Sequence, residues 1–143
     1  YVKGFINRMV ELARHQYPDS HITFHSHITP DDLILYADEN LISQVLINLL
    51  KNAIQAIEAA GIQEGIITLH AYCNENEAVL IEVSNNGPAI PPEVAEHIFI
   101  PFFTTKEGGS GIGLSISRQI MRLSGGNLSL HPGKETMFVL KFN

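Results

Sequence analysis

The chain has 143 residues, which suits a single domain with a buried core. A formal net charge of −6 argues against a broad nucleic-acid or anionic-membrane binding surface, because such a surface needs clustered lysine and arginine. One cysteine, Cys73, excludes an intramolecular disulfide framework, and no apolar run is long enough to span a membrane.

The first part of the chain predicts a helix and two strands. Residues 2–17 carry apolar side chains at helical spacing, and Pro18 ends that pattern. Residues 21–28 alternate like a strand, and residues 33–37 predict a second, shorter strand after a turn at Pro30.

Three histidines, His21, His25 and His27, share one face of the first predicted strand. A zinc site is one interpretation of this row. A solvent-facing strand surface is the interpretation we favour, because no cysteine or histidine partner stands at ligand spacing.

A long helix is predicted next, with Asp38 as its N-cap and its end near Ala60, before Gly61. One stripe of this helix is apolar and should be buried: Ile42, Leu46, Leu49, Ala53 and Ile57. A polar sector lies at the edge of that stripe: Gln44, Asn48, Lys51, Asn52 and Gln55.

Asn48 and Asn52 stand four residues apart, so their amides lie one above the other on the helix. Asparagine is a mediocre helix former, and two in register inside a long helix suggest a function. An amide oxygen is a hard ligand suited to Mg²⁺, which the protein often holds jointly with a phosphate chain. A solvated polar face is the alternative.

The second half predicts paired strands and two further helices. Strands are expected at 66–73, 78–84, 127–131 and 136–142, and helices around 93–99 and from the glycine-rich segment to Gly125. Cys73 should be a small buried apolar side chain. This order of elements predicts a two-layer α/β sandwich, with a mixed, mostly antiparallel sheet covered on one face by helices.

The segment KEGGSGIGLS, Lys106 to Ser115, feeds directly into the predicted late helix. Its glycines let the backbone approach a ligand closely, and the free N–H groups of a helix N-terminus favour an anion such as phosphate. A flexible connector would use the same glycines. The loop NNGPAIPP, from Asn85, is a second candidate, since an amide at a strand end can read the edge of a purine, although a plain turn uses the same residues.

The asparagine pair, the NNGPAIP loop and the PFFTTKEGGSGIGLS segment, in this order, resemble the catalytic ATP-binding domain of sensor histidine kinases. That family shares its Bergerat-type ATP-binding fold with gyrase B, Hsp90 and MutL. The resemblance covers essentially the whole chain, and its most specific part is the glycine-rich lid. It is nearest the nitrogen-regulator subgroup, and implies that residues 1–143 are one catalytic domain of a larger kinase whose phosphoacceptor and sensor regions lie elsewhere.

The resemblance implies a site for ATP or ADP with Mg²⁺. Its catalytic residues would be Asn48, Lys51 and Lys106, and its Mg²⁺ ligand Asn52. The F box and lid begin at Phe102. The full nucleotide-binding set would be Asn48, Asn52, Asn85, Gly87, Ala89, Ile90, Phe103, Thr104, Thr105, Lys106, Gly109, Ser110, Gly111, Ile112, Gly113, Leu114 and Thr136.

Two positions depart from the family pattern. Asn85 stands where the family has an aspartate that accepts a hydrogen bond from the adenine amino group, and Ala89 replaces a glycine. An asparagine loses the charge-assisted part of that bond, which weakens binding by roughly 1 kcal/mol, or about fivefold to tenfold in affinity. We expect ATP binding to be weakened and not abolished.

In the ATP-hydrolysing relatives a glutamate takes the place of Asn48, and an amide cannot act as a general base. The resemblance therefore implies a protein-histidine kinase domain that does not phosphorylate itself, because none of its seven histidines stands in the acceptor pattern. The implied partners are its own dimerisation and phosphoacceptor domain and a response regulator, with no nucleic acid. A homodimer is expected only for the full-length kinase, and the location is cytoplasmic.

A regulatory module of a different class is the alternative interpretation. Asn85 and Ala89 favour a domain that keeps the fold after nucleotide affinity has decayed and acts through protein contacts. The asparagine pair, Lys106 and the glycine lid favour the enzyme module.

Overall fold

The protein is described here by a computed structural model that covers residues 1–19, 21–100, 113–131, 133 and 135–142. Its elements are α1 (Val2–Gln16), β1 (Ile22–Thr29), α2 (Glu39–Ala59), β2 (Gly65–Cys73), β3 (Val79–Asn85), α3 (Pro92–Ala95), α4 (Gly113–Leu123), β4 (Gly126–His131) and β5 (Thr136–Phe142). The strands form one sheet in the order β1-β2-β3-β5-β4, with β1 parallel to β2 and all other neighbours antiparallel. The predicted α/β sandwich with a mixed, mostly antiparallel sheet is confirmed.

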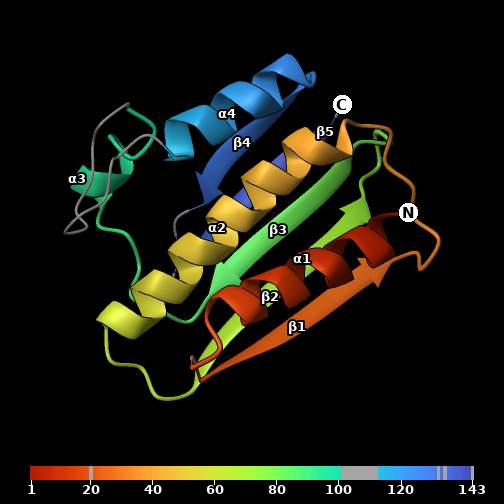
Figure 1. The fold of residues 1–143 in the computed structure, drawn as a ribbon. Coiled ribbons are helices and arrows are strands. Elements are labelled where there is room, and N and C mark those ends of the chain that lie inside the picture. Colours follow the sequence, from red (N-terminus) through yellow and green to blue (C-terminus); the bar gives the residue numbers. More distant parts are fainter. Residues whose placement is uncertain (20, 101–112, 132, 134, 143) are drawn as a thin grey trace.

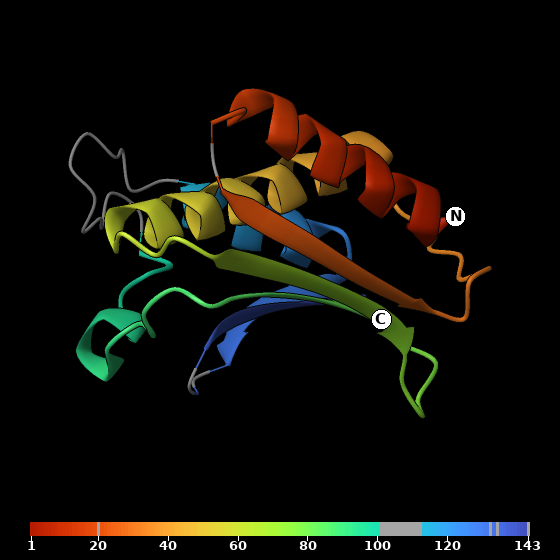
Figure 2. The same ribbon diagram turned by 90° about the horizontal axis from the view of Figure 1, so that it is seen from below.

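Three helices, α1, α2 and α4, cover one face of this sheet (Figure 1). Figure 2 shows all three on the same side. Strand alternation explains which side chains they bury: Ile67, Leu69 and Ala71 of β2 face the helices and are fully buried, whereas their neighbours in β2 face the other side and are partly exposed. The core therefore lies between the sheet and a single layer of helices.

Helix α2 is the central element of that layer and lies between α1 and α4 (Figure 1). The Asp38 carboxylate accepts hydrogen bonds from the backbone N–H groups of Asn40 and Leu41, at 2.9 and 3.2 Å, and so caps the helix as predicted. The C-terminal end is followed by Gly61 at φ +70°, a conformation that glycine adopts readily. All five residues of the predicted apolar stripe are buried.

The cap makes a first testable prediction. Asp38→Ala removes the acceptor for two N–H groups at the start of α2, and should lower the free energy of unfolding by about 1 kcal/mol in urea titrations. Asp32→Ala is the matched control, since Asp32 is exposed and makes no hydrogen bond or ion pair with its side chain within the described residues. Equal stability of the two variants would contradict the capping role.

The predicted short strand at 33–37 is wrong, because these residues form no strand. The backbone carbonyl of Leu33 accepts instead from the N–H of Val2 at 3.0 Å, and the Leu33 side chain is buried. The segment thus supplies a hydrogen-bond acceptor for the first turn of α1, and its Leu33 side chain packs into the core. A short apolar run in the sequence is compatible both with a strand and with a loop that buries one side chain, so the pattern alone could not distinguish them.

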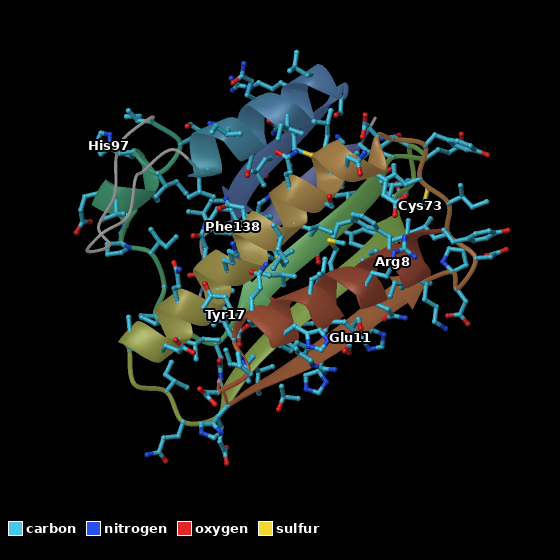
Figure 3. All side chains as sticks on the ribbon, in the orientation of Figure 1. Arg8, Glu11, Tyr17, Cys73, His97 and Phe138 are labelled. Carbon is cyan, nitrogen blue, oxygen red and sulfur yellow. The ribbon has the colours of Figure 1, made fainter. Side chains whose placement is uncertain are left out.

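Two further expectations need correction. The helix expected around 93–99 is only the single turn of α3, and the chain continues through three-residue turns in which His97 N–H donates to the Val94 carbonyl and Ile100 N–H to the His97 carbonyl, both at 2.9 Å. Cys73 is exposed and not buried, because it is the last residue of β2, at the hairpin end of the sheet (Figure 3).

Candidate functional site

Asn48 of α2 lies on the side of the helix that faces α4, and Asn52 follows it one helical turn later. Asn48 is half-buried, and its amide nitrogen donates to the hydroxyl of Ser117 at 3.2 Å. A Cβ atom built on Gly113 would lie 2.6 Å from the amide oxygen of Asn48. An alanine at position 113 would therefore require the Asn48 amide or the first turn of α4 to shift.

The rest of the polar sector of α2 lies at the edge of the core, as predicted. Asn52 and Lys51 are half-buried, whereas Gln44 and Gln55 are exposed. Gln55 donates to the hydroxyl of Tyr17 at 3.3 Å and so belongs to the contact with α1. Lys51 has no ion-pair partner within the described residues, which leaves its ammonium group available to an anion.

A second set of polar groups meets at the end of β3. Asn85 is buried there, between Ile67 of β2 and Thr136 of β5 in the strand register. Its side-chain oxygen accepts a hydrogen bond of 2.8 Å from the N–H of Gly87, a tight Asx turn. A Cβ on Gly87 would lie 2.7 Å from that same oxygen, so a larger residue at this turn would displace the Asn85 side chain.

The loop after Asn85 is held from both sides. Thr136 is buried, and its hydroxyl donates to the carbonyl of Pro88 at 3.2 Å. Asn86 pins the other side: its oxygen accepts from the N–H of Ile66 at 2.8 Å, and its nitrogen donates to the Glu64 carbonyl at 2.9 Å. Beyond this clamp Ala89 is exposed and Ile90 half-buried.

An aromatic contact joins α4 to the segment after α3. The guanidinium of Arg118 lies over the ring of Phe99, with its Cζ 4.2 Å from the ring centroid, and Phe99 meets Phe138 of β5 edge to face at 6.4 Å. Burial, with a smaller contribution from the nearby charge of Arg122, lowers the pKa of Arg118. Its Nε is buried and has no hydrogen-bond partner among the described residues.

Much of the predicted lid lies outside the described residues. This holds for Phe102, Phe103, Thr104, Thr105, Lys106, Gly109, Ser110, Gly111 and Ile112. Of the late glycine motif, the structure describes Gly113 and Leu114, and Leu114 is half-buried against the core. Two apolar residues of the helical pattern, Ile116 and Leu123, are largely exposed.

Sequence reasoning did not predict the contacts of three residues of this region: Ser117, Asn86 and Arg118. Ser117 could have been found, because it follows Gly113 by four residues and so shares its helix face, in phase with the buried Ile120 and Met121. The partners of Asn86 and Arg118 come from segments distant in the sequence, so no local sequence pattern predicts these contacts.

The histidine row does not form a metal site in the described part of the chain. His21, His25 and His27 are exposed, and no group of three or more histidine, cysteine or acidic side chains among the described residues could hold a metal ion. The favoured interpretation, a solvent-facing strand surface, holds.

The described helices include none that is long and apolar enough to cross a membrane.

The amides of α2 offer a chemically reasonable place for Mg²⁺. Asn48 and Asn52 supply uncharged oxygen ligands without a carboxylate, a set that suits a hard cation sharing its charge with a polyphosphate. The N-terminus of α4 stands against Asn48, so its backbone N–H groups and an anion could meet beside those amides. This arrangement suits binding and positioning of a nucleotide better than acid–base chemistry.

Comparison with known proteins agrees with this arrangement. Residues 37–143 match the family model described as histidine kinase-, DNA gyrase B-, and HSP90-like ATPase. The chain is 37% identical to the sensor histidine kinase ZraS of Salmonella typhi over 108 residues, which are 74% of this chain and 22% of ZraS. It is 36% identical to the adaptive-response sensory kinase SasA of Microcystis aeruginosa over 132 residues, 90% of this chain and 33% of SasA.

The nucleotide-free catalytic domain of histidine kinase ThkA has a closely similar structure. The TM-score is 0.83 at 36% sequence identity, and the match covers 97% of this chain and 90% of the ThkA domain. The chain spans only 22% and 33% of the lengths of ZraS and SasA, so it corresponds to one part of such kinases. The chain belongs to the histidine kinase-, DNA gyrase B- and HSP90-like ATPase family, within which it is a sensor histidine kinase catalytic domain.

Proposed function

We propose that this domain binds Mg·ATP between α2 and α4 and donates the γ-phosphoryl group to a histidine on a separate dimerisation and phosphoacceptor domain. The single observation that carries this proposal is the contact between the Asn48 amide and the α4 turn at Gly113. It supports the proposal because an anion bound at the start of α4 would lie beside the Asn48 amide.

Each part of the site has a separate task in this proposal. Asn52, with Asn48 beside it, holds Mg²⁺, which when bound neutralises charge on the phosphates. Lys51, and Lys106 from outside the described residues, contact the phosphates as cations. Asn85 and Thr136 lie by the purine base, where Gly87, Ala89 and Ile90 form the loop, and the remaining lid residues from Phe103 to Leu114 close over the nucleotide.

Phosphoryl transfer needs little proton chemistry from these residues. As a nitrogen–phosphorus bond to the acceptor imidazole forms, the bond from the γ-phosphorus to the bridging oxygen breaks, ADP leaves and the imidazole gives up its proton. Asn48 orients the phosphates and cannot remove a proton from water, so unaided hydrolysis of ATP should be slow. In this proposal most bound ATP therefore persists until the acceptor histidine arrives.

The acceptor histidine belongs to another domain in this proposal, because the curated relatives are three or more times longer than the matched part. A crystal structure of ThkA with the response regulator TrrA matches this chain at 34% identity with a TM-score of 0.78, which supports a response regulator as a second partner. We place the domain in the cytoplasm as the catalytic part of a larger, dimeric kinase. The same relatives are kinases, which favours the enzyme module over a regulatory one.

The experiment uses γ-labelled ATP with Mg²⁺ and follows transfer of label. The chain alone should remain unlabelled, and an added phosphoacceptor domain from the same kinase should gain label that acid removes, as expected of a phosphohistidine. Asn52→Ala should slow this transfer by about tenfold or more, because it removes the proposed Mg²⁺ ligand. Label on the isolated chain, or none on the acceptor, would contradict the proposal.

A further inference from the structure

The orientation of the Asn85 amide is fixed by its neighbour. The N–H of Gly87 can only donate, and it lies 2.8 Å from the side-chain oxygen of Asn85. Turning the amide over would set its NH₂ group against that N–H and lose the hydrogen bond. The oxygen therefore faces Gly87, and the NH₂ group faces away from it.

This orientation leaves a donor without a partner. Asn85 has 6% of its surface exposed, and its NH₂ group has no hydrogen-bond partner among the described residues. The only buried side-chain nitrogen or oxygen without a partner among the described residues is the Nε of Arg118, so the NH₂ group of Asn85 keeps some contact with solvent. A ligand that covers this group gains from presenting an acceptor to it and loses by presenting another donor. In a site that holds a purine base, this NH₂ group would favour bases that present an acceptor to it.

Purines differ at the edge that such a group would meet. Adenine carries an amino group at its 6-position, which donates, whereas guanine and hypoxanthine carry a carbonyl oxygen there, which accepts. A carboxylate at position 85 would accept from the amino group of adenine. The NH₂ group of Asn85 would instead donate to the 6-carbonyl of guanine or hypoxanthine. With adenine it would face the 6-amino group, which is also a donor.

We propose that Asn85 relaxes the base specificity of the site, so that 6-keto purine nucleotides bind at least as well as ATP and serve as phosphoryl donors beside it. This inference rests on the proposed function, since it places the base at Asn85. The Asx turn with Gly87 is what fixes the outcome, because it holds the amide oxygen toward Gly87 and turns the NH₂ group away from it. A single hydrogen bond of this kind changes the preference between the two bases by about tenfold.

Titration calorimetry of the chain with Mg²⁺ and either ATP or ITP tests this proposal. ITP isolates the 6-position, because hypoxanthine lacks the 2-amino group of guanine. The wild-type protein should bind ITP as tightly as ATP or more tightly. Asn85→Asp should shift the ratio of the two dissociation constants toward ATP by about tenfold or more, because a carboxylate accepts from the adenine amino group.

Asn127→Asp is the matched control, since it makes the same chemical change at an exposed position of β4 and should keep the wild-type ratio. Wild-type binding of ATP about threefold or more tighter than ITP would overturn the inference and leave the proposed function intact. Failure of both nucleotides to bind the wild type and Asn85→Asp would overturn both. If Asn85→Asp does not fold by circular dichroism, the wild-type ratio decides the question alone.

Discussion

Replacement of Gly113 by alanine should weaken binding of Mg·ATP by about thirtyfold while the domain stays folded. The added methyl group would lie 2.6 Å from the oxygen of Asn48 and 3.1 Å from its nitrogen. Either Asn48 swings away and loses its hydrogen bond to Ser117, or the first turn of α4 moves outward. Both changes separate the two parts of the proposed phosphate site, at a cost of about 2 kcal/mol in binding.

Stability should change much less than affinity in this variant, because the substitution lies in the first turn of α4 and removes no buried apolar side chain. Calorimetry gives the affinity and urea unfolding the stability. Gly4→Ala in α1 is the matched control: its added Cβ would meet its nearest atom, in the flexible Arg8 side chain, at 3.4 Å. It should gain helix propensity and leave ATP binding unchanged. A Gly113→Ala protein with wild-type affinity would disprove the proposed place of the phosphates.

The second large effect is expected in the core, at Leu50. This side chain is fully buried on α2, and Leu50→Ala should lower the free energy of unfolding by about 3 kcal/mol, through lost apolar burial and the cavity left behind. Domains of this size are stable by only about 5–15 kcal/mol, so the loss is a large fraction of the total. Equilibrium unfolding in urea measures it directly.

Leu123→Ala is the control for the core substitution. It removes the same atoms from a leucine that is 78% exposed at the end of α4, and should change stability by no more than about 0.5 kcal/mol. A loss at Leu123 as large as that at Leu50 would mean that α4 packs differently from this description.

The elements with strong periodicity were predictable from the sequence. Helix α2 combines a capping aspartate, an apolar stripe and a terminal glycine, and each signal points to the same element, so its place and its buried face are both confirmed. The segment at 33–37 had only a short apolar run. Its structure depends on a hydrogen bond to Val2, more than thirty residues earlier, and no local pattern contains such a partner.

The candidate site also has a part that the sequence predicted and a part that it could not predict. Sequence motifs pointed to Asn48, Asn85 and Gly113, and the family resemblance added Thr136. The structure brings Asn48 to Gly113, and it places Asn85 next to Thr136 on the neighbouring strand. The direction of each amide could not be predicted, because it depends on which neighbour donates and which accepts. The roles assigned to these residues, and to the lid outside the described residues, stay predictions.

The parallel pairing of β1 with β2 has a consequence for where this domain can be cut. The family match begins at residue 37, yet α1 and β1 lie before it, and six residues of α1 are buried in the core. A chain trimmed to the family boundary would lack the β1 neighbour of β2 and would expose the side of α2 that packs against α1. A bare, apolar edge strand pairs readily with other molecules, so we expect residues 37–143 alone to aggregate more readily than the whole chain.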